Sequence, residues 1–253
     1  PDTWNPVTIK QLLNHTSGLP DIEAGEDLVG EGSEDSAWET VQQMPLQFPV
    51  GQEFSYNATN YLLIQKIIEK YSGLPFEESI QVNQLDAVGM ERVLYGNSFD
   101  VVPHKSPTYL LHYWDEQIGD YVKGDDLMEI REEFPTILRA DAGVFTTASE
   151  MAKWVIALQK GELLQKTSIE KMWTPPEIKG EDLEDSDDIL KAYALGWPII
   201  QREDHPGVSA FGGGRASVSI YPEDDLAIIL FTNLTGVATY DIVDQIARFY
   251  FEP

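Results

Sequence analysis

GGGRASVSIYPEDDLAIILFTN, residues 212–233, has the pattern of two strands joined by a short turn at YPE. Ala216 to Tyr221 and Leu226 to Thr232 are the strand-like segments on either side of that turn. The second segment, LAIILFT, is apolar throughout, as expected for a strand that is covered on both faces. The stretch therefore predicts part of a sheet that other elements cover on both sides.

The segments around this stretch complete an α/β pattern. A third strand-like segment runs from Tyr193 to Gln201, and Tyr240 to Phe251 repeats apolar residues at helical spacing, as a helix lying on the sheet would. The acidic run 180–188 is typical of a solvated loop. We therefore expect a mostly helical subdomain, residues 1–188, and an incomplete antiparallel sheet with a C-terminal helix packed on it, residues 189–253.

The strongest helical signal is the segment Ala58 to Ser72. Its apolar residues recur at intervals of three and four, and Gly73 follows as a helix stop. A shorter helix is expected after Thr8, whose spacing from Gln11 is that of a capping box. Further along the chain, the sequence predicts a small hairpin at residues 109–121 and two more helices, at residues 149–159 and 168–173.

Composition limits the classes of function. The 253 residues include 17 Lys and Arg against 43 Asp and Glu, a formal net charge of −26, so most of the surface repels nucleic acid and anionic membranes. Cysteine is absent, no apolar run approaches the roughly 20 residues that span a bilayer, and PDTWNPVTIK lacks the pattern of a signal peptide. The histidines have no metal-ligand spacing, and we expect neither a metal nor another cofactor.

The predicted sheet needs partners that the sequence does not provide. Three strands that are apolar on both faces leave edges uncovered. No strand pattern among the first hundred residues is strong enough to complete the sheet. We therefore expect the chain to be the remainder of a longer one.

Four strings, in order along the chain, carry a resemblance to a known family: VTIKQLLNHTSGLPD, FSYNATNYLLIQKIIEKYSG, AGVFTTASEMAKW and GGGRASVSIYPEDDLAIILFTN. They resemble successive landmarks of the class C beta-lactamase-like serine hydrolases, a family that also contains penicillin-binding DD-peptidases, D-aminopeptidases and esterases. The resemblance implies the α/β fold of the beta-lactamase/transpeptidase type. It also implies a bacterial protein, exported to the periplasm or the extracellular space, with a small-molecule or peptide substrate.

The chemistry of the family implies a nucleophile that lies outside these strings. In such enzymes a serine attacks a carbonyl carbon, a lysine one helical turn later and a tyrosine move its proton, and two backbone amides hold the oxyanion. The Ser-x-x-Lys segment normally precedes HTSGLP. We therefore expect this chain to be inactive alone, with the missing N-terminal segment of the same protein as its partner. One Ser-x-x-Lys, Ser168 to Lys171, has the wrong order for the family and is interpreted as part of an ordinary helix.

Tyr56, in FSYNATNY, corresponds by this resemblance to the catalytic tyrosine. From the residues alone, the alternative is a tyrosine that packs beside a helix start capped by its polar neighbours. The third position of the motif contacts the substrate and is usually asparagine; here it is Ala58, whose side chain offers no hydrogen bond. His15, in HTSG, is expected to hydrogen-bond within its own turn.

The last motif is expected at Ala210, Phe211 and Gly212, where the family has Lys-Thr-Gly or His-x-Gly. By the resemblance, Phe211 and Gly212 would contact the substrate, and the backbone amide of Gly213 would hold the oxyanion. The string HPG at 205–207 also fits His-x-Gly, but it lies several residues too far from the YPE turn for a simple strand.

Arg215 follows Gly213 by two positions, so on a strand its side chain would lie on the same side. It could bind a substrate carboxylate through two parallel hydrogen bonds, or it could pair with one of the many surface carboxylates. Loss of the motif's lysine or histidine favours an ester or amide over a lactam or a D-Ala-D-Ala peptide, which both carry a carboxylate. The rival hypothesis is a non-catalytic family member that binds a peptide or cell-wall ligand.

Overall fold

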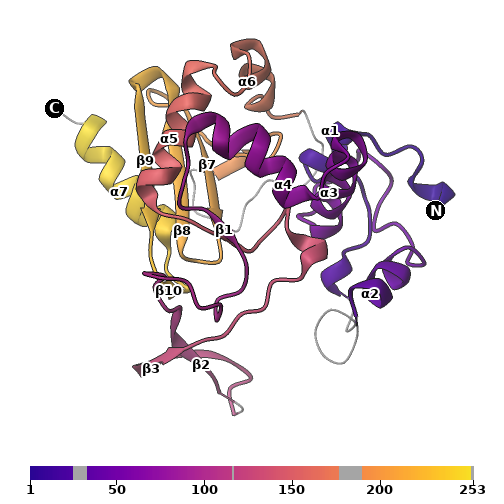
Figure 1. Ribbon diagram of the computed structural model, residues 1–253, viewed down its shortest axis with the longest axis horizontal. Helices are drawn as coiled ribbons and strands as arrows, with labels where there is room; N and C mark the ends of the chain where they lie inside the picture. Colours follow the sequence, from indigo (N-terminus) through magenta and orange to yellow (C-terminus); the bar gives the residue numbers. More distant parts are fainter. Residues whose placement is uncertain (25–32, 116, 177–189, 252–253) are drawn as a thin grey trace.

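The main sheet and the first helices lie at opposite ends of the molecule. A computed structural model describes residues 1–24, 33–115, 117–176 and 190–251 of the chain. Helices α1, α2 and α3 gather at one end, and the main sheet with helix α7 lies at the other (Figure 1). The predicted acidic loop, 180–188, and the predicted boundary at residue 188 lie outside the described residues.

The main sheet has five antiparallel strands in the order β5-β6-β7-β8-β9, where three were predicted. The predicted strand from Tyr193 to Gln201 is only partly present. β5 ends at Tyr193, a turn closed by a hydrogen bond from Ala194 N to Trp197 O (2.7 Å) follows, and β6 covers only Pro198–Ile200. A further strand precedes the YPE pair. The bounds are β5 (Leu190–Tyr193), β6 (Pro198–Ile200), β7 (Gly207–Gly212), β8 (Ala216–Tyr221) and β9 (Leu226–Phe231).

Both faces of this sheet are covered by helices, as the apolar segment LAIILFT predicted. Ala227, Ile229 and Phe231 of β9 pack into one core cluster with residues of helix α5 (Ala148–Lys160). The alternate residues Leu226 and Ile228 pack into another cluster with helix α7 (Thr239–Phe251). The alternation follows from the pleat of the strand, which turns successive side chains to opposite faces.

The helical end has its own core. Helix α3 (Ala58–Ser72) has the predicted bounds, and Gly73 ends it in the left-handed conformation. The capping box at Thr8 is also confirmed. Leu62 is completely buried in a cluster with residues of α2 and of the loop before Asp141. The remaining helices here are α1 (Ile9–Leu13), α2 (Glu34–Val41) and α4 (Phe76–Ile80), with short turns η1 (Asp2–Trp4), η2 (Ile22–Ala24), η3 (Gln81–Leu85) and η4 (Asp86–Val88).

Two small sheets and one short helix complete the described fold. The predicted hairpin is present but longer than expected, and its strands β2 and β3 project from the body beside β10 (Figure 1). Helix α5, from the predicted helical subdomain, packs on the main sheet, so the core of the sheet draws on both predicted parts. The bounds are β1 (Leu94–Tyr95), β2 (Tyr109–Asp115), β3 (Asp120–Glu129), η5 (Thr136–Leu138), β4 (Val144–Phe145), α6 (Lys166–Met172), η6 (Pro222–Asp224) and β10 (Leu234–Thr235).

The length and hydropathy of the described helices bear on whether any of them could span a membrane. Within the described ranges, every helix is too short or too polar to cross a lipid bilayer.

Gly18 should tolerate substitution far less well than Gly73. Both have φ of +71°, but a Cβ on Gly18 would lie 2.2 Å from the carbonyl oxygen of Phe48, whereas a Cβ on Gly73 meets nothing within 4 Å. The left-handed backbone alone costs an L-residue about 1–2 kcal/mol. We expect Gly73→Ala to lose that amount, and Gly18→Ala to lose about 1–3 kcal/mol more because its neighbours must move. Urea unfolding of both variants measures this, and equal losses would contradict it.

Candidate active site

The loop HTSG is held against the start of α3 by His15. His15 has φ of 56°, an uncommon backbone conformation for a residue other than glycine. Its Nδ1 lies 3.2 Å from the backbone N of Asn57 and 3.1 Å from Nδ2 of Asn60. Because a backbone N–H can only donate, Nδ1 is the acceptor. This corrects the expectation that His15 bonds within its own turn.

Further buried hydrogen bonds join the same two segments. Ser17 Oγ donates to Asn60 Oδ1 (2.5 Å), and Asn57 Nδ2 donates to the carbonyl oxygen of Leu19 (2.7 Å). The hydroxyl of Thr59 donates to the carbonyl oxygen of Pro20 (2.7 Å). Asn57 is the N-cap residue of α3, yet its side chain makes no capping bond. The polar residues at the start of α3 therefore hold the HTSG loop against the helix directly after Tyr56.

Tyr56 stands at the surface at the point where these segments meet. Its side chain is 61% exposed, and its ring lies on the ring of His15 with centroids 4.4 Å apart. The hydroxyl donates to Oδ1 of Asp141 at 3.5 Å, a long hydrogen bond. Tyr193 of β5 packs edge-on to the same histidine, so the main sheet and the helical end meet here. Tyr56 thus presents its hydroxyl beside a carboxylate at the junction of the two parts.

Burial and nearby negative charge hold the proton on the hydroxyl of Tyr56. Partial burial and then repulsion from the Asp141 carboxylate raise the pKa of Tyr56 far above its ordinary value. Burial, together with the neighbouring Asp21, also raises the pKa of Asp141, and burial with repulsion from Asp141 and Asp21 raises the pKa of Glu23. In this arrangement the phenol is protonated at neutral pH and can donate a hydrogen bond.

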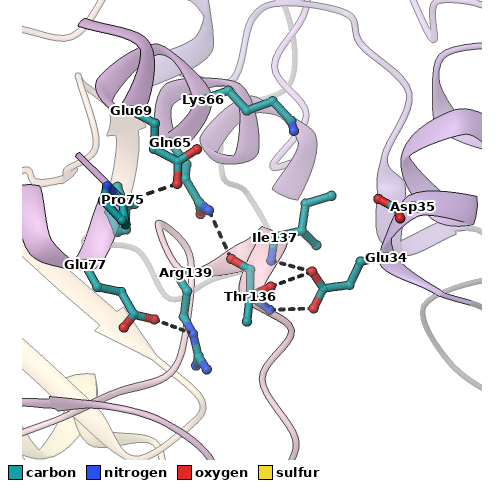
Figure 2. Close-up of a pocket in the computed structure, with 11 residues that line it drawn as sticks. Glu34, Asp35, Gln65, Lys66, Glu69, Pro75, Glu77, Thr136, Ile137 and Arg139 are labelled. Atoms are coloured by element: carbon teal, nitrogen blue, oxygen red, sulfur yellow. Dashed lines mark hydrogen bonds and ion pairs between the residues drawn. The ribbon is translucent and has the colours of Figure 1, made fainter. Parts of the chain in front are cut away.

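The loop that carries Asp141 is braced by side chains from distant elements. Glu34 of α2 accepts hydrogen bonds from the backbone and hydroxyl of Thr136, at 2.7 and 2.6 Å. Gln65 of α3 donates to the carbonyl oxygen of Thr136 (3.0 Å) and accepts from Ala140 N (3.1 Å). Figure 2 shows the contacts of Thr136 with Glu34 and Gln65 around a pocket of about 330 Å³. Because Glu34 and Gln65, two of the side chains that line this pocket, bond to the loop that carries Asp141, we interpret the pocket as the support of that loop.

The predicted oxyanion residue lies in a turn between β7 and β8. Gly213 and Gly214 have φ of 58° and 56°, and Arg215 N donates to the carbonyl oxygen of Gly212 at 3.2 Å. Two successive residues with positive φ are typical of the type I′ turn that joins hairpin strands. The strand alternation expected for Gly213 and Arg215 is therefore wrong. Arg215 reaches Gly213 by folding back over the turn, and a Cβ built on Gly213 would lie 3.1 Å from its Nε.

Arg215 is paired with a carboxylate of the protein. Its two terminal nitrogens donate to Oε2 and Oε1 of Glu132, at 2.6 and 2.9 Å, and one of them also donates to Thr235 Oγ1 at 2.9 Å. Of the two roles considered for Arg215, the structure has the ion pair. Glu132 occupies the end-on fork of the guanidinium, which its two terminal nitrogens form.

The predicted site residues lie in two separate places, at the glycine turn between β7 and β8 and at the start of α3. Phe211 is 51% exposed beside the glycine turn, where it packs against Tyr240. Ala58, expected at the substrate-binding position, is instead 2% exposed within the helical core, because it lies on the inner face of α3. Among the described residues, the hydrogen bond of Tyr56 is with Asp141 and none joins it to the glycine turn.

Two polar residues of the site were missed in the sequence. Asp141 directly precedes the string AGVFTTASE, so a carboxylate adjoining a family landmark was a signal that could have been used. Glu132 follows the hairpin in an acidic stretch, where no local pattern distinguishes it from its neighbour Glu133.

Comparison with known proteins places the chain in a family. The family model described as Beta-lactamase matches residues 1–250, and the chain belongs to this family. Penicillin-binding protein 4* of Bacillus subtilis (strain 168) is 25% identical, over 84% of this chain and 49% of its own length. The chain thus spans about half the length of that relative.

Solved structures have the same fold. A penicillin-binding protein from Bacillus halodurans is 26% identical with a TM-score of 0.72, over 97% of this chain and 73% of the other. A D-amino acid amidase from Ochrobactrum anthropi SV3 is 20% identical with a TM-score of 0.74, over 96% and 72% of the two chains. The predicted α/β fold of the beta-lactamase/transpeptidase type is therefore confirmed.

Proposed function

We propose that this chain is the C-terminal major part of a serine hydrolase that forms an acyl-enzyme with an ester, amide or peptide substrate. The observation that carries the proposal is the hydroxyl of Tyr56, exposed at the start of α3 and bonded to Asp141. Membership of the beta-lactamase family supports it. The nucleophilic serine and its lysine would come from a Ser-x-x-Lys segment of the same protein outside these residues.

The chemistry assigns each group a task. The serine oxygen forms a bond to the carbonyl carbon of the substrate, and its proton passes through Tyr56 to the leaving group, whose bond then breaks. Water then forms a bond to the acyl carbon, the bond to the serine oxygen breaks, a proton from the water returns through Tyr56 to that oxygen, and the acid is released. The amide of Gly213 is proposed as one donor to the oxyanion, a role that needs backbone geometry and no side chain.

The raised pKa of Tyr56 supports the need for a lysine. In the described chain the groups that shift this pKa are carboxylates, a second tyrosine and burial, none of which favours the phenolate. A lysine ammonium within about 4–6 Å would lower the pKa and allow the tyrosine to accept a proton as well as donate it. The lysine of the proposed segment would supply that charge.

A substrate panel on the complete parent protein tests the function. We expect turnover of chromogenic esters or D-amino-acid amides to exceed turnover of a cephalosporin. The reason is that Ala210 replaces the motif's lysine or histidine and that Glu132 occupies Arg215. The measurement is kcat/KM for each compound. Dominant cephalosporin hydrolysis would contradict the expected order, and no turnover of any compound would contradict the enzyme proposal.

A second candidate is a family member that binds a peptide or cell-wall ligand without catalysis. The substitutions at Ala58 and Ala210 favour it, because two motif side chains are lost. The parent protein would then bind ligand and yield no acyl-enzyme detectable by mass spectrometry. By the family resemblance we also propose export from a bacterial cell, which fractionation of cells that express the parent gene would test.

A further inference from the structure

We propose that Glu132 determines substrate specificity by occupying the guanidinium of Arg215, so that the site takes acyl substrates without a carboxylate beside the glycine turn. This inference rests on the proposed function and narrows its substrate class. Neither residue is needed for the acyl transfer steps themselves, and the ion pair would act by excluding one group of substrates.

The geometry of the pair is that of a bound carboxylate ligand. Two parallel hydrogen bonds of 2.6 and 2.9 Å join the guanidinium of Arg215 to the two oxygens of Glu132. This fork-to-fork arrangement is the one in which arginine recognises carboxylates in general. Glu132 therefore fills the end-on position at this guanidinium, one of the positions in which arginine binds a carboxylate.

The pair is fixed in place from both sides. The backbone N of Glu132 donates to Ser98 Oγ at 2.5 Å, and Ser98 N donates to the carbonyl oxygen of Glu132 at 3.0 Å. On the other side, Arg215 also donates to Thr235 Oγ1 at 2.9 Å. The backbone of Glu132 is therefore held at the point from which its carboxylate reaches Arg215.

The pair also lies where a substrate can reach it. The side chains of Arg215 and Glu132 keep 21% and 27% of their surfaces exposed. The Nε of Arg215 lies 3.1 Å from the position of a Cβ on Gly213, the proposed oxyanion donor. A substrate held at Gly213 thus has its neighbouring substituents beside the ion pair.

Specificity then follows from competition and repulsion. A carboxylate on the substrate meets an arginine that is already bonded and a glutamate of its own charge. A neutral substituent meets neither penalty. Unfavourable contacts of this kind discriminate between substrates as effectively as favourable ones.

The test uses two aryl esters with the same acyl group, one with phenol and one with 3-hydroxybenzoate as the leaving group. In the complete protein, Glu132→Gln is expected to raise the ratio of kcat/KM for the carboxylate ester over the phenyl ester by about tenfold, as one charge-assisted hydrogen bond would. Glu133→Gln removes the same charge from the exposed neighbour and serves as the matched control. A ratio within twofold of wild type in Glu132→Gln, or an equal rise in Glu133→Gln, overturns the proposal.

A binding measurement separates this proposal from the proposed function. Benzoate is titrated into the complete protein while the Nε–Hε resonance of Arg215 is followed by NMR, which needs no turnover. Benzoate is expected to shift this resonance with about tenfold tighter binding in Glu132→Gln than in wild type. Glu132→Ala provides a second variant if the first fails to fold. If the complete protein turns over neither these esters nor any compound of the substrate panel, the proposed function fails; the absence of any benzoate shift in the folded variants overturns the role of Glu132.

Discussion

Replacing Tyr56 with phenylalanine in the complete protein should lower acyl transfer about 10²- to 10⁴-fold, the usual contribution of a general acid or base. The phenylalanine ring keeps the stacking on His15, and only the hydroxyl beside Asp141 is lost. Because that hydroxyl makes one long hydrogen bond at an exposed position, the free energy of unfolding should fall by about 1 kcal/mol or less. The measurements are kcat/KM on the best substrate of the panel and the thermal midpoint.

Tyr61→Phe is the matched control, from the same helix. The hydroxyl of Tyr61 donates to the carbonyl oxygen of Leu13 at 3.2 Å, where α1 and α3 meet, and is not assigned a catalytic role. We expect its loss to affect stability more than the rate. If Tyr56→Phe keeps a rate within threefold of wild type, Tyr56 belongs to the packing of the helix start, and the non-catalytic hypothesis gains.

His15 should make the protein sensitive to mild acid. Burial lowers the pKa of His15 from 6.5 to about 4, since the folded protein holds the imidazole neutral. Between these two values the unfolded chain binds a proton that the folded chain does not, so stability falls as the pH drops from about 6.5 to about 4. The difference between the two pKa values corresponds to about 3 kcal/mol of lost stability below that range.

The variant His15→Asn isolates this contribution from that of the many carboxylates. Asparagine tolerates a positive φ and offers an acceptor near the position of Nδ1, but it does not titrate. Urea unfolding of wild type and variant at pH 7, 5.5 and 4 should show a gap that changes by about 3 kcal/mol in favour of the variant. His104→Asn, at an exposed histidine that also has positive φ (65°), is the matched control for the substitution itself. Parallel curves for wild type and His15→Asn would contradict the buried, neutral state.

Patterns within single segments of the sequence predicted α3 and β9, the strand that is covered on both faces. Helical spacing and a glycine stop specify α3 from within its own residues, and an unbroken apolar run specifies β9. The segment from Tyr193 to Gln201 was misread because its apolar residues suit a strand. The turn at Ala194 to Trp197 also bonds to a distant segment, through the hydrogen bond from Gly196 N to Leu13 O. A contact of this kind cannot be recognised from the local sequence pattern.

The candidate site divides in the same way. Tyr56 was predicted as the catalytic tyrosine because the residues of its motif are contiguous in the sequence. Its catalytic role stays a prediction. Asp141 and Glu132 were missed because each meets its partner across 85 and 83 residues of chain. His15 was assigned to its own turn for the same reason, since its partners lie 42 and 45 residues away. Side-chain pairing over such separations leaves no periodic trace in a single sequence.

The braced loop before Asp141 has a consequence for transplanting parts between family members. Its backbone shape is specified by Glu34 and Gln65, which lie 102 and 71 residues from Thr136 along the chain. A graft of residues 134–142 into a relative without those two side chains would transfer the amino-acid sequence of the loop. It would lose the hydrogen-bond donors and acceptors that fix the loop's backbone conformation. The unit that can be exchanged is therefore the loop together with α2 and the middle of α3. Only a graft of all three segments would keep the Asp141 carboxylate in its position beside Tyr56.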